Sequence, residues 1–154
     1  MRKRNSQEAA VADIIHKFPI KAPQQAVFDM FATPAGLDRW WTKESSGEPK
    51  VGAIYRLYFG PGYDWKARVT ECVPGLAFEL AMTEAHEDWA TSKVGCNLSK
   101  EGQAGTHVLF HHTGWPKENE HWRVSNFCWA MYLRVLRRAL EYGEIVPYEM
   151  RLDV

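Results

Sequence analysis

The sequence has no excess of charge of either sign, since 19 lysines and arginines balance 19 aspartates and glutamates over 154 residues. Nucleic-acid-binding domains and proteins that bind anionic membranes normally carry a basic surface. The balance therefore excludes a dominant electrostatic attraction to either partner, and we expect no nucleic acid. No apolar run approaches the ~18 residues of a membrane span, so we expect no membrane insertion either.

Cysteine is scarce, and its three positions, Cys72, Cys96 and Cys128, are widely separated. An odd, widely spaced set predicts neither a disulfide framework nor a CxxC metal knuckle. The basic residues 1–4 are followed by the polar residues 5–8 rather than by the apolar segment of an export signal. We therefore expect a reduced, cytoplasmic protein whose residues 1–11 form a flexible tail.

Repeats, low-complexity runs and long linkers are also missing, which predicts one domain over residues 1–154. What the chain does have is aromatic side chains, with 7 Trp, 6 Tyr and 7 Phe, although its mean hydropathy is only -0.41. So many large rings in a short soluble chain indicate a large apolar core or a pocket.

Apolar periodicity predicts the order of the elements. Residues 13–20 alternate as a strand, Pro23 begins a short helix that ends near Thr33–Pro34, and residues 36–41 form a second helical turn. Five strands follow, joined by short loops, over residues 54–59, 65–73, 76–82, 93–98 and 106–112. Because parallel neighbours need long crossovers, these strands must be antiparallel. The alternation directs Leu76, Phe78 and Leu80 inward. A long amphipathic helix over residues 117–142 completes the chain.

Several motifs follow one another along these elements. They are Ile20-Lys21-Ala22-Pro23 with Val27-Phe28, Thr33-Pro34 before Trp40-Trp41, Thr106 to Phe110 before His112-Thr113-Gly114-Trp115, and Trp129 with Leu133 and Leu136 before Gly143. Together these motifs resemble the START-like helix-grip (SRPBCC) superfamily. They match the branch related to the C-terminal domain of the activator of the heat-shock protein 90 ATPase. The resemblance implies an α+β fold, in which a curved antiparallel sheet wraps around the long C-terminal helix and encloses an apolar cavity.

The candidate cavity residues are the inward positions of the strands and of the long helix, because an apolar wall with few polar groups suits a small-molecule site. The same side chains could equally fill a close-packed core. The predicted ligand-binding residues are Phe18, Tyr55, Leu57, Phe59, Trp65, Phe78, Leu80, Val108, Phe110, His112, Trp122, Ser125, Trp129 and Leu133. We expect a small hydrophobic or amphipathic ligand.

His112 and Ser125 are the polar members of this set, and either the protein or a ligand must satisfy them. His112 could also serve as the base for a Cys96 nucleophile. The expected strand register places Cys96 opposite Val108 and His112 opposite Ser92, which offsets the two by roughly 13 Å. That separation excludes a catalytic dyad, and we expect no catalytic residues.

A metal site is not expected, because the adjacent His111 and His112 point to opposite faces of a strand. His121, with Glu118 and Glu120, lies beyond a proline turn, and the sequence has no HxxxH or HExxH spacing. No cofactor is predicted. Two alternatives to ligand binding stay open: a co-chaperone-like module with a protein partner or a homodimer, and a cyclase or hydrolase acting inside the same cavity.

Overall fold

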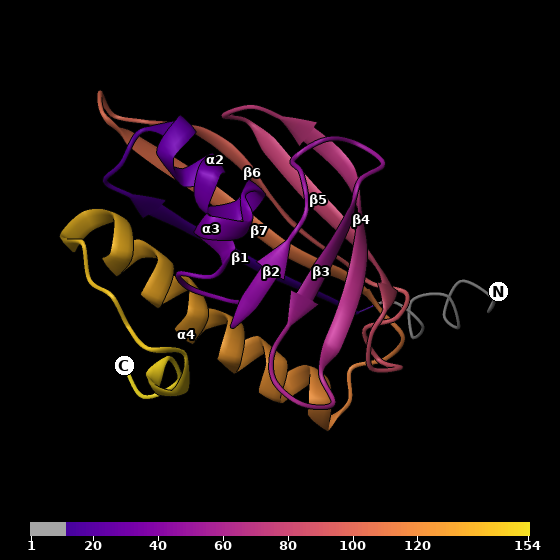
Figure 1. Ribbon diagram of the computed structural model, residues 1–154. Coiled ribbons are helices and arrows are strands. Elements are labelled where there is room, and N and C mark those ends of the chain that lie inside the picture. The colour runs from indigo at the N-terminus through magenta and orange to yellow at the C-terminus, as the bar shows by residue number, and fades with distance from the viewer. Residues whose placement is uncertain (1–11) are drawn as a thin grey trace, which may run out of the picture.

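A seven-stranded antiparallel sheet curves around the long C-terminal helix in the computed structural model, which describes residues 12–154 (Figure 1). The strands are β1 (Ala12–Ile20), β2 (Glu44–Ser46), β3 (Ile54–Tyr58), β4 (Asp64–Val73), β5 (Ala77–Glu84), β6 (Lys93–Glu101) and β7 (Gly105–Trp115). Their spatial order is β1-β7-β6-β5-β4-β3-β2. The predicted helix-grip architecture is confirmed, and the predicted tail lies outside the described residues.

The helices are α2 (Gln24–Ala32), α3 (Pro34–Leu37), α4 (Glu120–Tyr142) and the short 3-10 helix η1 (Tyr148–Met150). The helix α4 begins three residues later than predicted, because the Asn119 side chain caps it by accepting a hydrogen bond from the Trp122 amide at 2.9 Å. It ends at Gly143, whose left-handed φ of 68° suits a glycine C-cap. Within residues 12–154 no helix is both long and apolar enough to cross a bilayer.

Two details of the sheet differ from the prediction. The short strand β2 pairs with β3 at one edge of the sheet, and no periodicity marks a strand of three residues. Leu76 was expected inside but is 50% exposed, and Val73 is 44% exposed. A register shift between Val69 and Glu71 breaks the alternation in β4, and Leu76 lies in the turn before β5, so the pleat does not direct its side chain inward.

Tryptophan rings fill most of the space between the sheet and α4. Trp129 of α4 is 2% exposed, and its ring centroid lies 5.1 Å from that of Trp41, 5.9 Å from that of Trp89 and 4.6 Å from that of Phe110. Near Trp40 only a void of about 10 Å³ remains, which is about the size of one water molecule. The interior beneath the centre of the sheet is therefore a packed core.

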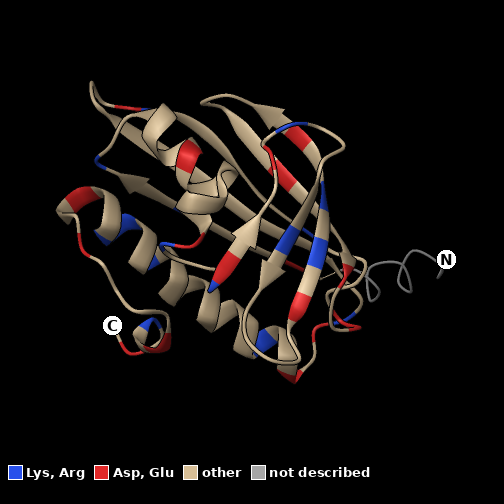
Figure 2. Cartoon of the chain, in the orientation of Figure 1, with Lys and Arg blue, Asp and Glu red and all other residues tan. Residues whose placement is uncertain are grey.

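Charged residues of both signs are interspersed along the strands at the open edge of the sheet (Figure 2). On β3 and β4, Arg56 Nε lies 2.9 Å from Asp64 Oδ1, and Lys66 pairs with Glu84 of β5 at 3.6 Å. Alternating cross-strand pairs of this kind leave no strand face of a single sign in that region.

Candidate functional site

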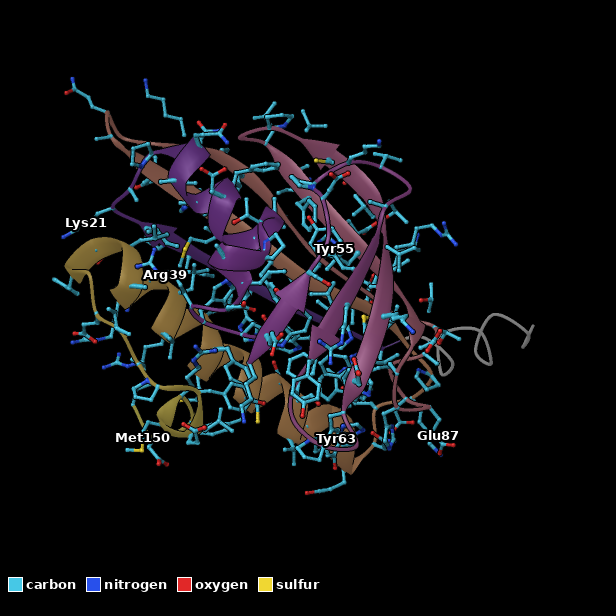
Figure 3. The ribbon with its side chains drawn as sticks, viewed as in Figure 1. Lys21, Arg39, Tyr55, Tyr63, Glu87 and Met150 are labelled. Atoms are coloured by element: carbon cyan, nitrogen blue, oxygen red, sulfur yellow. The ribbon has the colours of Figure 1, made fainter. Side chains whose placement is uncertain are left out.

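One aromatic hollow remains beside the first half of α4, with a volume of about 350 Å³. We call it the aromatic pocket, and its lining residues are Trp41, Phe59, Tyr63, Trp65, Trp89, His121, Val124, Ser125, Cys128, Tyr132 and Tyr148. The hairpin between β3 and β4, which carries the labelled Tyr63, lies next to α4 in Figure 3. The pocket thus lies between the end of the sheet, the long helix and the C-terminal segment.

A second hollow of about 520 Å³ lies at the opposite end of α4. Charged side chains of both signs border it, among them Lys21, Arg137 and Glu141. Glu141 Oε2 already accepts a hydrogen bond from the Lys21 amide at 2.8 Å. Small-molecule sites are mainly apolar with a few polar groups, so the smaller aromatic pocket is the better candidate.

Three of the predicted cavity residues, Phe59, Trp65 and Ser125, line the aromatic pocket. The others lie elsewhere in the fold. Tyr55, Leu57, Phe78, Leu80, Val108, Phe110, His112, Trp129 and Leu133 are buried, whereas Phe18 and Trp122 are half-buried. Phe18 and Leu133 border a small surface groove between β1 and α4. Alternation identifies which side chains point inward, but it does not show where the packed rings leave space.

Eight lining residues were absent from the predicted set, and two of them had a partial signal. Trp89 was conspicuous as a large ring in an acidic loop, and the structure buries it to 8% exposure with its ring 5.1 Å from that of Trp65. Of the adjacent Trp40 and Trp41, one ring was expected in the core and the other half-exposed, but both are buried, at 1% and 3% exposure. Tyr148, by contrast, follows the last predicted element, and no pattern in the sequence indicated that this segment returns to the pocket.

The C-terminal segment closes one side of the pocket, and buried Arg151 holds it there. The Arg151 guanidinium donates to the carbonyls of Asp38 at 2.6 Å, Thr42 at 3.1 Å and Val146 at 3.2 Å. It also lies 5.4 Å from the centroid of the Tyr148 ring, and the Tyr148 hydroxyl donates to Phe59 O at 3.0 Å. These contacts fix the Tyr148 ring as a wall of the pocket.

His112 takes part in a linear series of buried hydrogen bonds that runs from Trp129 to the carbonyl of Trp89. Trp129 Nε1 donates to His112 Nδ1 at 2.9 Å, so the proton of the neutral ring lies on Nε2. This nitrogen donates to Ser92 Oγ at 2.8 Å, and the Ser92 hydroxyl donates to Trp89 O at 2.7 Å. Burial lowers the pKa of His112 to about 3. Because Nε2 already carries a proton, it cannot take one from Ser92, and the pair lacks the arrangement of a catalytic dyad.

The register between β6 and β7 differs from the predicted one. Cys96 pairs with Phe110, and His112 pairs with Val94, because the hairpin closes at Glu101 and Gly105. The offset between Cys96 and His112 is therefore two residues, or roughly 7 Å, rather than four. Burial raises the pKa of the Cys96 thiol, and both nitrogens of His112 are already hydrogen-bonded. His112 therefore has no free ring nitrogen that could serve Cys96 as a base.

Three polar groups of the pocket wall, Tyr132, Tyr148 and Cys128, are neutral at physiological pH. Burial raises the pKa of Tyr132 to about 12, and it also raises the pKa values of Tyr148 and the Cys128 thiol. Neutral hydroxyls can donate hydrogen bonds to a ligand without requiring a charged one. The wall is suited to holding an apolar molecule and orienting one polar group on it.

A cluster of ligating side chains lies at the mouth of the pocket. His86, Asp88 and His121 each offer one potential ligand atom, and these atoms lie within 4.8 Å of one another. In the sequence, His121 stands with Glu118 and Glu120 instead. No sequence pattern indicates this cluster, because the loop after β5 and the start of α4 are brought together only in the folded chain.

Comparison with known proteins relates this chain to one protein family. A family model described as "Activator of Hsp90 ATPase homolog 1-like protein" matches residues 21–141, whereas no curated protein matches. The solution structure of the Aha1 dimer from Colwellia psychrerythraea is 28% identical, with a TM-score of 0.77, and the match covers 86% of this chain and 98% of that one.

Two further solved structures share the fold. Protein MLL2253 from Mesorhizobium loti is 17% identical with a TM-score of 0.76, and the match covers 87% of this chain and 100% of that one. CalU16 from Micromonospora echinospora is 23% identical with a TM-score of 0.71, and the match covers 92% of this chain and 81% of that one.

Proposed function

Because this chain belongs to the Activator of Hsp90 ATPase homolog 1-like family, with its helix-grip fold, we propose that it binds a small apolar or amphipathic molecule in the aromatic pocket. The observation that carries the proposal is the hollow of about 350 Å³, which seven Trp, Tyr and Phe rings line. Its volume lies within the range of ordinary ligand sites, roughly 300–1,000 Å³.

The chemistry of the wall supports this class of ligand. Each 100 Å² of apolar ligand surface removed from water contributes roughly 2.5 kcal/mol to binding. Tyr63, Tyr132 and Ser125 in the lining carry hydroxyls that can hydrogen-bond a polar group, and Phe59 and Trp65 provide apolar rings. Tyr148 is held in place by Arg151 and Phe59, so this part of the wall is ordered before a ligand arrives, which lowers the entropic cost of binding.

A pocket-filling substitution tests the proposal. Cys128→Trp adds an indole to the wall of the pocket, and we expect it to weaken the binding of the fluorescent probe 1-anilinonaphthalene-8-sulfonate by at least about tenfold. Arg123→Trp is the matched control, because it adds the same ring to an exposed position of α4 outside the pocket. Equal probe affinity in the parent and Cys128→Trp would contradict the proposal.

A second variant tests the pocket independently, in case Cys128→Trp loses probe binding because it misfolds. Tyr63 is 55% exposed at the rim of the pocket, so Tyr63→Ala should leave the melting temperature nearly unchanged while it weakens probe binding severalfold. Native mass measurement on protein purified without detergent then shows whether a molecule from the cell is bound. Extraction of a reproducible adduct would identify the natural ligand.

We propose as a second function that an exposed face of α4 mediates self-association of the protein. On α4, Val124 is 50% exposed and Phe127 is 64% exposed, and residues three apart share one helix face. The related Aha1 protein from Colwellia psychrerythraea is a dimer. We expect light scattering to give twice the chain mass for the parent and the single-chain mass for Phe127→Glu. A parent of single-chain mass at high concentration would contradict this proposal.

A further inference from the structure

His86, Asp88 and His121 meet at the mouth of the aromatic pocket, and we propose that they bind a divalent late transition-metal ion such as Zn²⁺. The first two lie in the loop between β5 and β6, whereas His121 lies in the first turn of α4. Their potential ligand atoms lie within 4.8 Å of one another. Imidazole nitrogen and carboxylate oxygen are preferred ligands of Zn²⁺ and its neighbours in the first transition row.

The contacts within this metal cluster already orient the ligand atoms. His121 Nδ1 lies 2.9 Å from Asp88 Oδ2, and Asn119 Nδ2 donates to the same oxygen at 3.3 Å. The Asp88 amide donates to His86 Nδ1 at 3.1 Å, so this nitrogen carries a lone pair, and the exposed His86 ring must turn it from the amide to the metal. A cation would replace the proton between His121 and Asp88.

The cluster needs only a small closure to hold a metal ion. Zn–N and Zn–O bonds of about 2.0–2.1 Å place neighbouring ligands roughly 3.3 Å apart. The rings of His86 and His121 are edge-to-face with centroids 4.7 Å apart, and His86 is exposed on its loop, so rotation of its side chain meets little resistance. Asn119, which caps α4, ties the Asp88 carboxylate to the start of the helix as an outer-shell partner would.

Charge around the site also matters, because the N-terminus of a helix repels cations. The Asp88 carboxylate opposes this effect directly. Glu87 flanks Asp88 on the loop, and Glu118 and Glu120 flank the helix start. Glu87 lies at the loop end of the molecule in Figure 3. Lys117 and Arg123 balance Glu118 and Glu120 at the helix start, whereas residues 83–91 carry three acidic side chains and no lysine or arginine. The charge of the loop therefore favours a divalent ion there.

The position of the cluster connects the metal to the pocket. Tyr63 and Trp65 line both the aromatic pocket and the adjoining hollow that contains His86, Asp88 and His121. Three protein ligands leave at least one tetrahedral position open. If the proposed ligand binding holds, an anionic or nitrogen-containing head group of the pocket ligand would complete the coordination of the metal.

Metal titration of the full chain tests the site without any pocket ligand. Calorimetry with Zn²⁺ should give one ion per chain, and Co²⁺ should give visible absorption bands typical of nitrogen and oxygen coordination. We expect Asp88→Asn and His121→Ala each to lower the affinity at least about tenfold. His107→Ala is the matched control, because its ring also faces a carboxylate, Glu101 at 3.5 Å, but has no second histidine beside it.

The outcomes separate this proposal from the proposed function. Equal Zn²⁺ affinity in the parent and His121→Ala, or no saturable binding at submillimolar Zn²⁺, would overturn the metal site. Asp88→Asn keeps the size of the side chain, and its melting temperature in a metal chelator checks that the fold is intact. Binding of 1-anilinonaphthalene-8-sulfonate in the same chelator reports on the pocket alone, so either proposal can fail while the other stands.

Discussion

Trp129→Ala should lower the free energy of unfolding by about 4 kcal/mol, because this ring is the centre of the aromatic core. It is 2% exposed and contacts Trp41, Trp89 and Phe110. The substitution removes the apolar contacts, leaves a cavity beneath the sheet and deprives His112 Nδ1 of its donor. Urea denaturation followed by circular dichroism measures the change.

Two companion variants divide this loss into its parts. Trp129→Phe keeps a ring but removes the Nε1 donor to His112, and leaving a buried acceptor unpaired costs about 1–3 kcal/mol. Trp122→Ala changes the same residue type on the same helix at a half-buried position, and its effect should be clearly smaller. If Trp122→Ala were as destabilising as Trp129→Ala, the core would not be centred on Trp129.

Acid should destabilise the protein through His112 well before the carboxylates titrate. Its pKa in the folded state is lowered from 6.5 to about 3 by burial. Below pH 6.5 the unfolded chain therefore takes up a proton that the folded chain refuses, and stability falls by at most about 1.4 kcal/mol per pH unit as pH decreases towards 3. Above 6.5 both states are neutral at this residue, and it contributes no pH dependence.

The comparison that isolates His112 uses a side chain that does not titrate. We expect the free energy of unfolding of His112→Gln to change less between pH 6.5 and 5 than that of the parent, whatever its absolute stability. His107→Gln, at a half-buried position of the same strand, is the matched replacement of a second histidine for comparison. Parallel curves for the parent and His112→Gln would show that His112 is not held neutral. The window above pH 5 avoids Asp88, whose lowered pKa places its titration at more acidic values.

The hydrogen bonds around His112 show which structural features local sequence patterns predict and which they do not. Alternation in β7 correctly predicted a buried histidine, and burial required a hydrogen-bond partner. The choice between a ligand and the protein depended on Ser92 and Trp129, which lie 20 and 17 residues away in the sequence. The predicted register was off by two residues, because a pattern of alternation is unchanged by a shift of two.

Apart from β2 and η1, the order of strands and helices could be predicted from the chain alone, as could the antiparallel pairing, the long amphipathic helix and its glycine cap. Each depends on local rules: a period of two or 3.6 residues, turn residues and short connections. Together with the family motifs they identify the helix-grip fold. The composition also shows that the chain is rich in large aromatic rings, but it does not show how those rings pack.

The position of the pocket was decided by tertiary structure. Inward-facing side chains such as Phe78 and Phe110 are consistent with either a cavity or a core, and only the packing of Trp41, Trp89 and Trp129 shows that the centre is filled. The remaining space depends on Tyr148, which long-range hydrogen bonds of Arg151 bring back to the sheet. Likewise, His86 and His121 meet only because the sheet places the loop after β5 beside the start of α4. Periodicity reports the direction of a side chain, whereas empty space and converging ligands are properties of segments that are distant in sequence.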